Sequence, residues 1–302
     1  MTDIWACSNC SSINRQRANR CYKCGADREV AATGDMDDLR VSEAVAQRTV
    51  QRYRGSTLRF MIAALLIVAV AAVGIVILLE SLRDVDQVRN AFLATITGDT
   101  TDDAALTASA ERLGGAQMLH LGLIVAAVAA FGAWLSRVIS NIPTLGGGLP
   151  ATSPTRAFIY PFIPLWNLFK VPGIIQDAMY RLDPKSGGFF MVAIAWFGLV
   201  GSWLVNFVGG WIITYIAMRD LGTAVAEGSR VGILQVAGET FDRLILLNVI
   251  TSSMVAAGAV MLVLVMARIE RRARDRDADV RAALMASGFT SAHHADQVSA
   301  EA

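Results

Sequence analysis

All four cysteines of this 302-residue chain lie near its N-terminus, at positions 7, 10, 21 and 24. They form two pairs with two residues between the cysteines of each pair, and ten residues separate the pairs. Two such pairs suit tetrahedral Zn²⁺ held by four thiolates at about 2.3 Å. Because so short a segment has no hydrophobic core, metal binding would supply its folding free energy. We therefore predict one structural zinc ion on Cys7, Cys10, Cys21 and Cys24.

Three other uses of paired cysteines are a redox dithiol, a disulfide framework and an iron–sulfur site. A single pair would leave redox chemistry open, whereas two pairs at this spacing argue for a metal. The side of the membrane predicted below is reducing, which disfavours disulfides. Nearby basic residues would offset the negative charge of a tetrathiolate site: Arg15, Arg17, Arg20, Lys23 and Arg28.

Trp5 and Asn14 extend the cysteine pattern to W-x-C-x2-C-x3-N-x6-C-x2-C. This pattern, within residues 1–29, resembles the Ran-binding-protein type of zinc finger. The resemblance implies two crossed β-hairpins, with Trp5 and Asn14 supporting them. It carries over no ligand. The RNA-binding members resemble one another in an aromatic after the Asn and then an Arg pair, where this chain has Arg15 and Arg17–Ala18. The ubiquitin-binding members share Thr-Phe after the second Cys, where this chain has Ser11–Ser12.

Beyond the finger, apolar residues gather in four long blocks. Hydrophobic residues make up 54% of the chain and charged residues only 18%, whereas soluble domains are about a quarter charged. Each block is long enough to cross a bilayer, which takes about 20 helical residues. Buried helices of a soluble core would be shorter and more interrupted. We therefore predict an all-α membrane protein with four transmembrane helices at about 58–79, 117–138, 189–217 and 244–267.

Basic residues set the predicted orientation. With both termini on one side, 21 of the 27 Lys and Arg residues fall on that side. Because cytoplasmic segments carry the excess of Lys and Arg, both termini are predicted to be cytoplasmic in a multi-pass protein of the cell membrane. The flanking parts are predicted as a juxtamembrane linker with an amphipathic helix at 30–57, a four-span domain at 58–268 and a charged, disordered tail at 269–302.

Local patterns add detail to the spans. After the first span, Val85 to Ile96 continue a helical stripe that Gly98 ends, and a second short helix would run through Arg112. In the third block, Gly209–Gly210 is the predicted bend. Small or polar residues four apart in that block would let a neighbouring helix approach closely: Gly198, Ser202, Asn206, Gly210 and Thr214. Trp134 is predicted to anchor its span at the membrane surface.

The loop between the second and third spans carries P-x-x-N-L-x-x-x-P, formed by Pro164, Asn167 and Pro172, with Pro161 just before it. After Pro172 an apolar stripe predicts a short interfacial helix that starts there. The motif resembles a signature of a bacterial membrane family known only as a domain of unknown function, over about residues 55–270. The resemblance implies a four-span fold, often preceded by a zinc finger, and no activity. Asn167 could bind a ligand, but capping a helix or tying down backbone carbonyls is the simpler role.

For function, we expect a non-enzymatic scaffold or sensor whose finger docks a cytosolic protein at the lipid bilayer. No HExxH, GxSxG or P-loop motif is present. The alternative is a small transporter or channel, which would need polar groups along a pathway. Its candidates are His120, Asn206 and Arg137, and four spans would require a homo-oligomer for alternating access.

Overall fold

The computed structural model describes residues 4–6, 13–15, 40–41, 44–45, 47–48, 53–83, 85–97, 103–183 and 188–286. Near the N-terminus, β1 (Ile4–Ala6) pairs antiparallel with β2 (Ile13–Arg15), and Trp5 lies opposite Asn14. Cys7, Cys10, Cys21 and Cys24 lie outside the described residues, so the zinc site and the second hairpin of the finger stay predictions.

The prediction of four helices suited to span a membrane is confirmed. Among the described residues, four helical stretches are long and apolar enough to cross a bilayer: Thr57–Arg83, Glu111–Asn141, Phe189–Ala226 and Arg230–Met285. They correspond to α2 (Thr57–Arg83), α4 (Asp103–Asn141), α7 (Phe189–Trp196) joined through the π-helical η3 (Phe197–Gly201) to α8 (Ser202–Ala226), and α9 (Arg230–Ala286).

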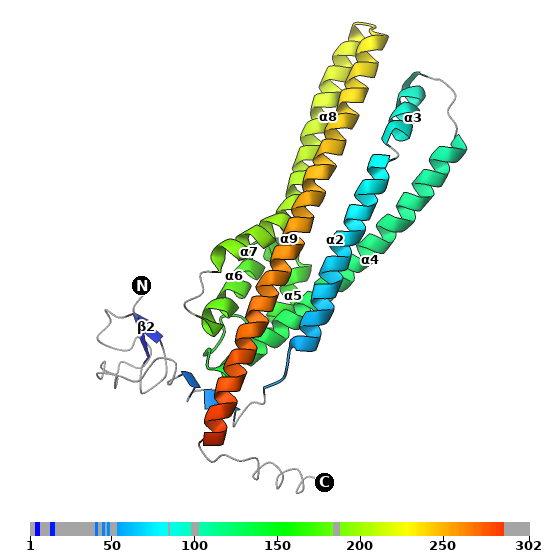
Figure 1. Cartoon of the computed structure of the whole chain (residues 1–302). Coiled ribbons are helices and arrows are strands. Elements are labelled where there is room, and N and C mark those ends of the chain that lie inside the picture. The colour runs from blue at the N-terminus through cyan, green and yellow to red at the C-terminus, as the bar shows by residue number, and fades with distance from the viewer. Residues whose placement is uncertain are drawn as a thin grey trace.

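The ribbons of the spans form two helical pairs that stand farther apart toward the end where α8 meets α9 (Figure 1), although Arg89 of the helix after α2 still lies 3.6 Å from Asp242 of α9. One pair is α2 with α4, and the other is α8 with α9. A tight turn with Gly228 at a positive φ of 66° joins α8 to α9, a backbone conformation that glycine adopts without strain. At 57 residues, α9 is about 86 Å long and extends well beyond a hydrocarbon core of about 30 Å.

After the orientation predicted from the basic residues, we call the end of the membrane domain where α2 begins the inner end and the opposite end the outer end. At the outer end, the helical stripe predicted to follow the first span is present as α3 (Val85–Thr97). We expected the next helix to be short. Instead it runs unbroken from Asp103 through Arg112 into the second span as α4. No proline lies between Arg112 and the apolar block, so nothing stops the helix there. The bend predicted at Gly209–Gly210 is also wrong, because α8 is continuous there and the irregular turn is η3.

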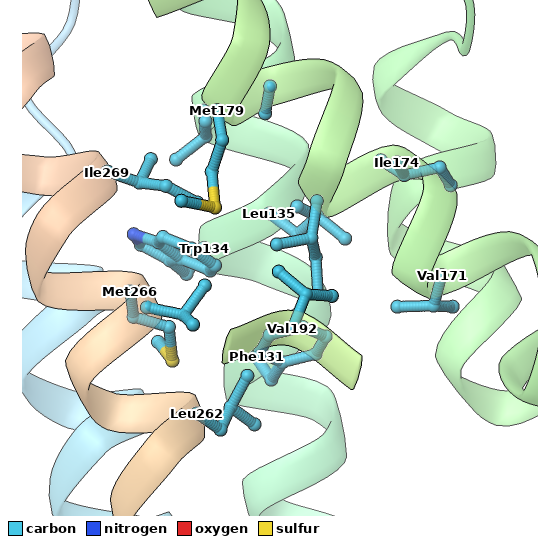
Figure 2. Packing of buried hydrophobic residues seen from close by; sticks show 14 of the residues in the cluster. Phe131, Trp134, Leu135, Val171, Ile174, Met179, Val192, Leu262, Met266 and Ile269 are labelled. Carbon is cyan, nitrogen blue, oxygen red and sulfur yellow. The ribbon is translucent and has the colours of Figure 1, made fainter. Parts of the chain in front are cut away.

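The best-packed part of the molecule lies at the inner end, near both termini of the membrane domain. Figure 2 shows Trp134 of α4 beside Met266 and Ile269 of α9 and Met179 of α6 (Pro164–Leu182). Trp134 is fully buried, so the prediction that it anchors the span at the membrane surface is wrong.

The inner loop folds onto this core through η1 (Pro143–Leu145), α5 (Pro154–Ile159), η2 (Tyr160–Phe162) and α6. The short helix predicted to begin at Pro172 begins instead at Pro164, and Pro172 lies inside it. Its apolar stripe does not lie on lipid, as an interfacial helix would, because protein covers it: Val171, Ile174, Ile175, Ala178, Met179 and Leu182 are buried. The core of the inner half therefore includes the loop.

The tail beyond the fourth span is helical up to Ala286, which corrects the prediction of disorder over 269–302 for that part. Residues spaced along one face of this extension are buried: Glu270, Ala273, Asp277 and Val280. Their spacing of three or four residues aligns them on a single helical face. The sequence did not predict this buried helical face because only two of its four residues are apolar.

Candidate functional site

The candidate site begins at a buried carboxylate where α2 enters the membrane domain. Glu270 of α9 is 1% exposed. Ser56 Oγ lies 3.0 and 2.9 Å from its two carboxylate oxygens, and Thr57 Oγ1 donates to Oε1 at 2.9 Å. The indole Nε1 of Trp134 approaches Oε2 at 3.4 Å. One carboxylate thus joins α2, α4 and α9.

The position of Glu270 explains how a buried carboxylate is tolerated. Ser56 and Thr57 stand at the N-terminus of α2, where the backbone carbonyl of Ser56 accepts from the amide of Phe60 at 2.9 Å. A helix N-terminus carries a partial positive charge that favours an anion. Hydrogen bonds to an ionised acceptor are also stronger than neutral ones. Both effects offset the cost of removing the carboxylate from water.

A second acidic residue, Asp277, holds the segment before α2. Arg48 Nη2 lies 2.6 Å from Asp277 Oδ1, and both side chains are about nine-tenths buried. Arg48 Nε also donates to the backbone carbonyl of Thr144 at 3.0 Å, and its guanidinium lies 5.3 Å from the ring centre of Tyr53. Arg281 approaches the other oxygen of Asp277 at 2.6 Å. The ion pair links residues far apart in the sequence.

Tyr53 lies within this charged group. Burial raises the pKa of its phenol, and the negative charges of Asp277 and Glu270 raise it further. The positive charges of Arg48 and Arg281 act in the opposite direction but do not outweigh burial.

Asn141, at the end of α4, fixes the backbone of the same segment. Its Nδ2 donates to the carbonyl of Arg54 at 2.7 Å, and its Oδ1 lies 3.5 Å from the amide of Arg54. We define the inner polar cluster as the residues that hold Arg48 and residues 53–57 against α4 and α9: Arg48, Tyr53, Ser56, Thr57, Trp134, Asn141, Glu270 and Asp277.

Sequence reasoning missed this cluster. One signal was present: Glu270 and Asp277 lie seven residues apart inside the Arg-rich stretch that follows the last span. Two helical turns separate them, so both carboxylates lie on one face. The arginines of this stretch were interpreted only as a signal for membrane orientation, so the two acidic residues among them were not considered.

A separate cavity of about 210 Å³ lies between α2, α4 and α9, nearer the outer end. His120 is one of its lining residues, and the Nε2 atom of His120 is buried without a hydrogen-bond partner. Gly74 provides space for the imidazole, because a Cβ there would lie 3.4 Å from its Cε1. Polar groups from all three helices also line the cavity: Ser81, Gln117, Asn248 and Ser252.

The three residues proposed for a transport pathway do not share this cavity. Asn206 is not among its lining residues, and its Nδ2 donates to Thr251 Oγ1 at 3.2 Å between α8 and α9. Arg137 lies near the inner end of α4, four residues before Asn141. The predicted small-residue face is partly confirmed in its packing, since Gly198 meets Gly258 and Ser202 is buried.

In the inner-loop motif, Asn167 acts through its backbone. Its carbonyl accepts from Trp196 Nε1 at 2.8 Å, which ties α6 to α7. Its side-chain Oδ1 is buried and has no hydrogen-bond partner. Pro164 occupies the first turn of α6, where a missing amide hydrogen costs nothing, and Pro161 is buried in η2. The motif thus shapes the inner core.

Among the residues that the structure describes, no group of three or more His, Cys, Asp or Glu side chains could hold a metal ion. The predicted zinc ligands are not among those residues.

Comparison with known families gives a match for the membrane domain. A family model described as a domain of unknown function, DUF4328, matches residues 97–271, more than half of the chain. The chain belongs to this family. The DUF4328 match covers α4 to the start of the α9 extension, including Glu270, and begins after α2. No curated protein and no solved structure matches the chain.

Proposed function

We propose that the protein is a membrane-anchored scaffold or sensor that presents an N-terminal zinc finger to a cytosolic protein partner. The observation that carries the proposal is the inner polar cluster. Arg48 and Ser56 lie in the segment that leads from the finger to α2, and they bind Asp277 and Glu270 of the last helix. A finger on such a held segment would keep a restricted position at the membrane surface.

The finger itself is proposed on the cysteine pattern, with one zinc ion on Cys7, Cys10, Cys21 and Cys24. The antiparallel pairing of Trp5 with Asn14 agrees with a hairpin on either side of the first cysteine pair. Metal analysis of the purified protein should give one zinc per chain, and Cys7→Ser should lower this ratio. An unchanged ratio would contradict the assignment.

The docking role is tested by proximity cross-linking of the full-length protein in its native cells. A photoreactive group in the finger should capture the same protein repeatedly, and Cys7→Ser with Cys24→Ser should abolish the capture. Arg48→Ala should reduce it while leaving zinc content and membrane insertion intact. Arg219→Ala is the matched control, because the side chain of Arg219 is exposed and pairs with its neighbour Asp220. Capture that is indifferent to the finger variants would refute the proposal.

The cavity around His120 favours a second candidate, a small oligomeric transporter or channel. An imidazole can both accept and donate a proton, and amide and hydroxyl groups line the cavity beside that of His120. Proton flux into proteoliposomes, driven by a potassium diffusion potential, should then fall in His120→Ala. Asn206→Ala serves as the control because Asn206 does not line the cavity. Flux that survives His120→Ala would remove this candidate.

A further inference from the structure

One arginine of α4 and two arginines from the start of α2 are held close to the inner end of α4. Ala133, Arg137 and Asn141 are four residues apart, so they lie in a row along the helix. Arg59 Nη1 donates to the carbonyl of Ala133 at 3.1 Å. Asn141 holds the backbone of Arg54 at the other end of the row. The segments that carry Arg59 and Arg54 are therefore fixed one turn to either side of Arg137. We call Arg54, Arg59 and Arg137 the arginine cluster.

No acidic residue in the described part of the chain pairs with the arginine cluster, whereas Arg48, Arg181 and other arginines have carboxylate partners. The Nε atom of Arg137 is buried and has no hydrogen-bond partner. The arginine cluster would gain from an anion that accepts hydrogen bonds from several guanidinium groups at once.

Apolar surface lies directly beside these arginines. On α2, Leu58 and Ile62 flank Arg59 in the helix and are 70% and 47% exposed. On α5, the backbone carbonyl of Phe158 lies against Gly132 of α4, one residue before Ala133. The ring of Phe158 stands 5.5 Å from that of Phe162, and both side chains are more than one-third exposed. A ligand at the arginines would therefore meet hydrocarbon-compatible surface as well as positive charge.

The position of the arginine cluster along the spans indicates which kind of anion it would bind. Arg54 and Arg59 lie where α2 begins, at the end of the membrane domain where α9 finishes. The charge bias predicts that this end faces the inner leaflet, whose anionic lipids attract arginines near the surface. A free phosphate could use the guanidinium groups but not the apolar flanks.

We propose that the arginine cluster binds the phosphate of an anionic phospholipid in the inner leaflet, with its acyl chains on the apolar surface of α2 and α5. Arg137 contributes a donor from the middle of the site, and Arg54 and Arg59 contribute donors from either side. The planar guanidinium of arginine suits phosphate because it can donate two parallel hydrogen bonds.

The test measures lipid binding to the delipidated full-length protein by native mass spectrometry, with thermal unfolding as the second readout. The probes are dioleoyl-phosphatidylglycerol, dioleoyl-phosphatidylcholine and inorganic phosphate. Phosphatidylglycerol should bind and raise the unfolding temperature more than the other two. Arg137→Gln should weaken phosphatidylglycerol binding about tenfold, as expected for the loss of a charged hydrogen bond.

Two further variants keep the test decisive. Arg54→Gln combined with Arg59→Gln should weaken binding at least as much, and the bonds of Asn141 to the backbone of Arg54 can persist in it. Arg243→Gln is the control, because Arg243 lies at the outer part of α9 and pairs with Glu239. Equal binding of phosphatidylcholine, or no loss in the cluster variants, would overturn the site. Equal protection by inorganic phosphate would overturn its assignment to a lipid.

Discussion

At the scale of single residues, the membrane domain depends on two acids that sit among arginines in the sequence. Glu270 and Asp277 could be exposed partners of the basic tail, but each is more than nine-tenths buried and binds the segment that precedes α2. Removing a buried hydrogen-bond acceptor leaves its donors unsatisfied, which costs more than the net strength of the bonds.

Glu270→Ala should therefore lower the free energy of unfolding by about 3 kcal/mol, because Ser56, Thr57 and Trp134 lose their acceptor. Glu270→Gln should cost less, since one oxygen acceptor remains. Glu239→Ala is the control: its half-exposed pair with Arg243 on the same helix contributes less than about 0.5 kcal/mol. Reversible unfolding in mixed micelles measures these values, and equal losses at positions 270 and 239 would contradict the burial argument.

Tyr53 should make the free energy of unfolding depend on pH. Its folded-state pKa is raised by burial and by Asp277 and Glu270, above the value of about 10 for a free phenol. At a pH between the free-phenol pKa and the higher folded-state pKa, Tyr53 keeps its proton in the folded state and loses it in the unfolded state. The free energy of unfolding therefore falls as the pH rises through this range. Below about pH 10 the Tyr53 contribution is fully present.

Tyr53→Phe should consequently remove part of the alkaline loss of stability. The difference in phenolate absorbance between wild type and Tyr53→Phe should show a titration above that of a free tyrosine. A difference titration at or below the free value would mean that Tyr53 is not buried among these charges.

At the scale of elements, two helices approach closely where glycines face each other. A Cβ on Gly258 of α9 would lie 2.7 Å from backbone atoms of Gly198 and Leu199 in η3. The π-helical turn and the close approach thus occur at the same place. Small residues allow such contacts between membrane helices, where packing rather than hydrophobicity favours association.

Gly258→Ala should separate α9 from η3 and lower the free energy of unfolding by about 1–3 kcal/mol, the usual cost of overpacking. Gly210→Ala in α8 is the matched control, because a Cβ at that position would have no atom outside its own helix backbone within 4 Å. There the change should be neutral or slightly stabilising, since alanine favours a helix interior by about 1 kcal/mol. Equal effects at the two positions would argue against the glycine contact.

At the scale of the whole molecule, the two helical pairs are joined tightly at the inner end and diverge at the outer end (Figure 1). The inner loop adds α6 to the core there, and buried aromatic and aliphatic residues of α4 and α9 close around it (Figure 2). The outer cavity lies above this packed region. The buried core of the molecule is therefore concentrated at its inner end.

The predicted orientation can be tested on the whole protein with a membrane-impermeant thiol reagent. Glu227→Cys, in the turn between α8 and α9, should be labelled in intact cells. Met285→Cys, 74% exposed near the end of α9, should add label only after the membrane is permeabilised. The wild-type chain is the control, because its four native cysteines lie at the N-terminus. Labelling of the wild type in intact cells would reverse the orientation.

The amino-acid sequence by itself determined the number of spans and their class, because 20-residue apolar blocks and the positive-inside bias are properties of composition along the chain. It also gave the zinc prediction, because the spacing of two cysteine pairs within a short segment is enough to indicate a tetrahedral metal site. It did not reveal that Trp134 and the α6 stripe face protein, because an apolar side chain gives the same pattern whether it faces lipid or a core.

Only the tertiary structure decided the inner polar cluster and the arginine cluster. Ser56 and Glu270 are 214 residues apart, and Arg54 reaches Asn141 across 87. Such contacts have no local pattern, since each partner alone resembles an ordinary surface residue. Which arginines pair with an acid depends on how α2, α4 and α9 pack. Among the described residues, tertiary packing pairs Arg48 with Asp277 and gives Arg137 no carboxylate partner.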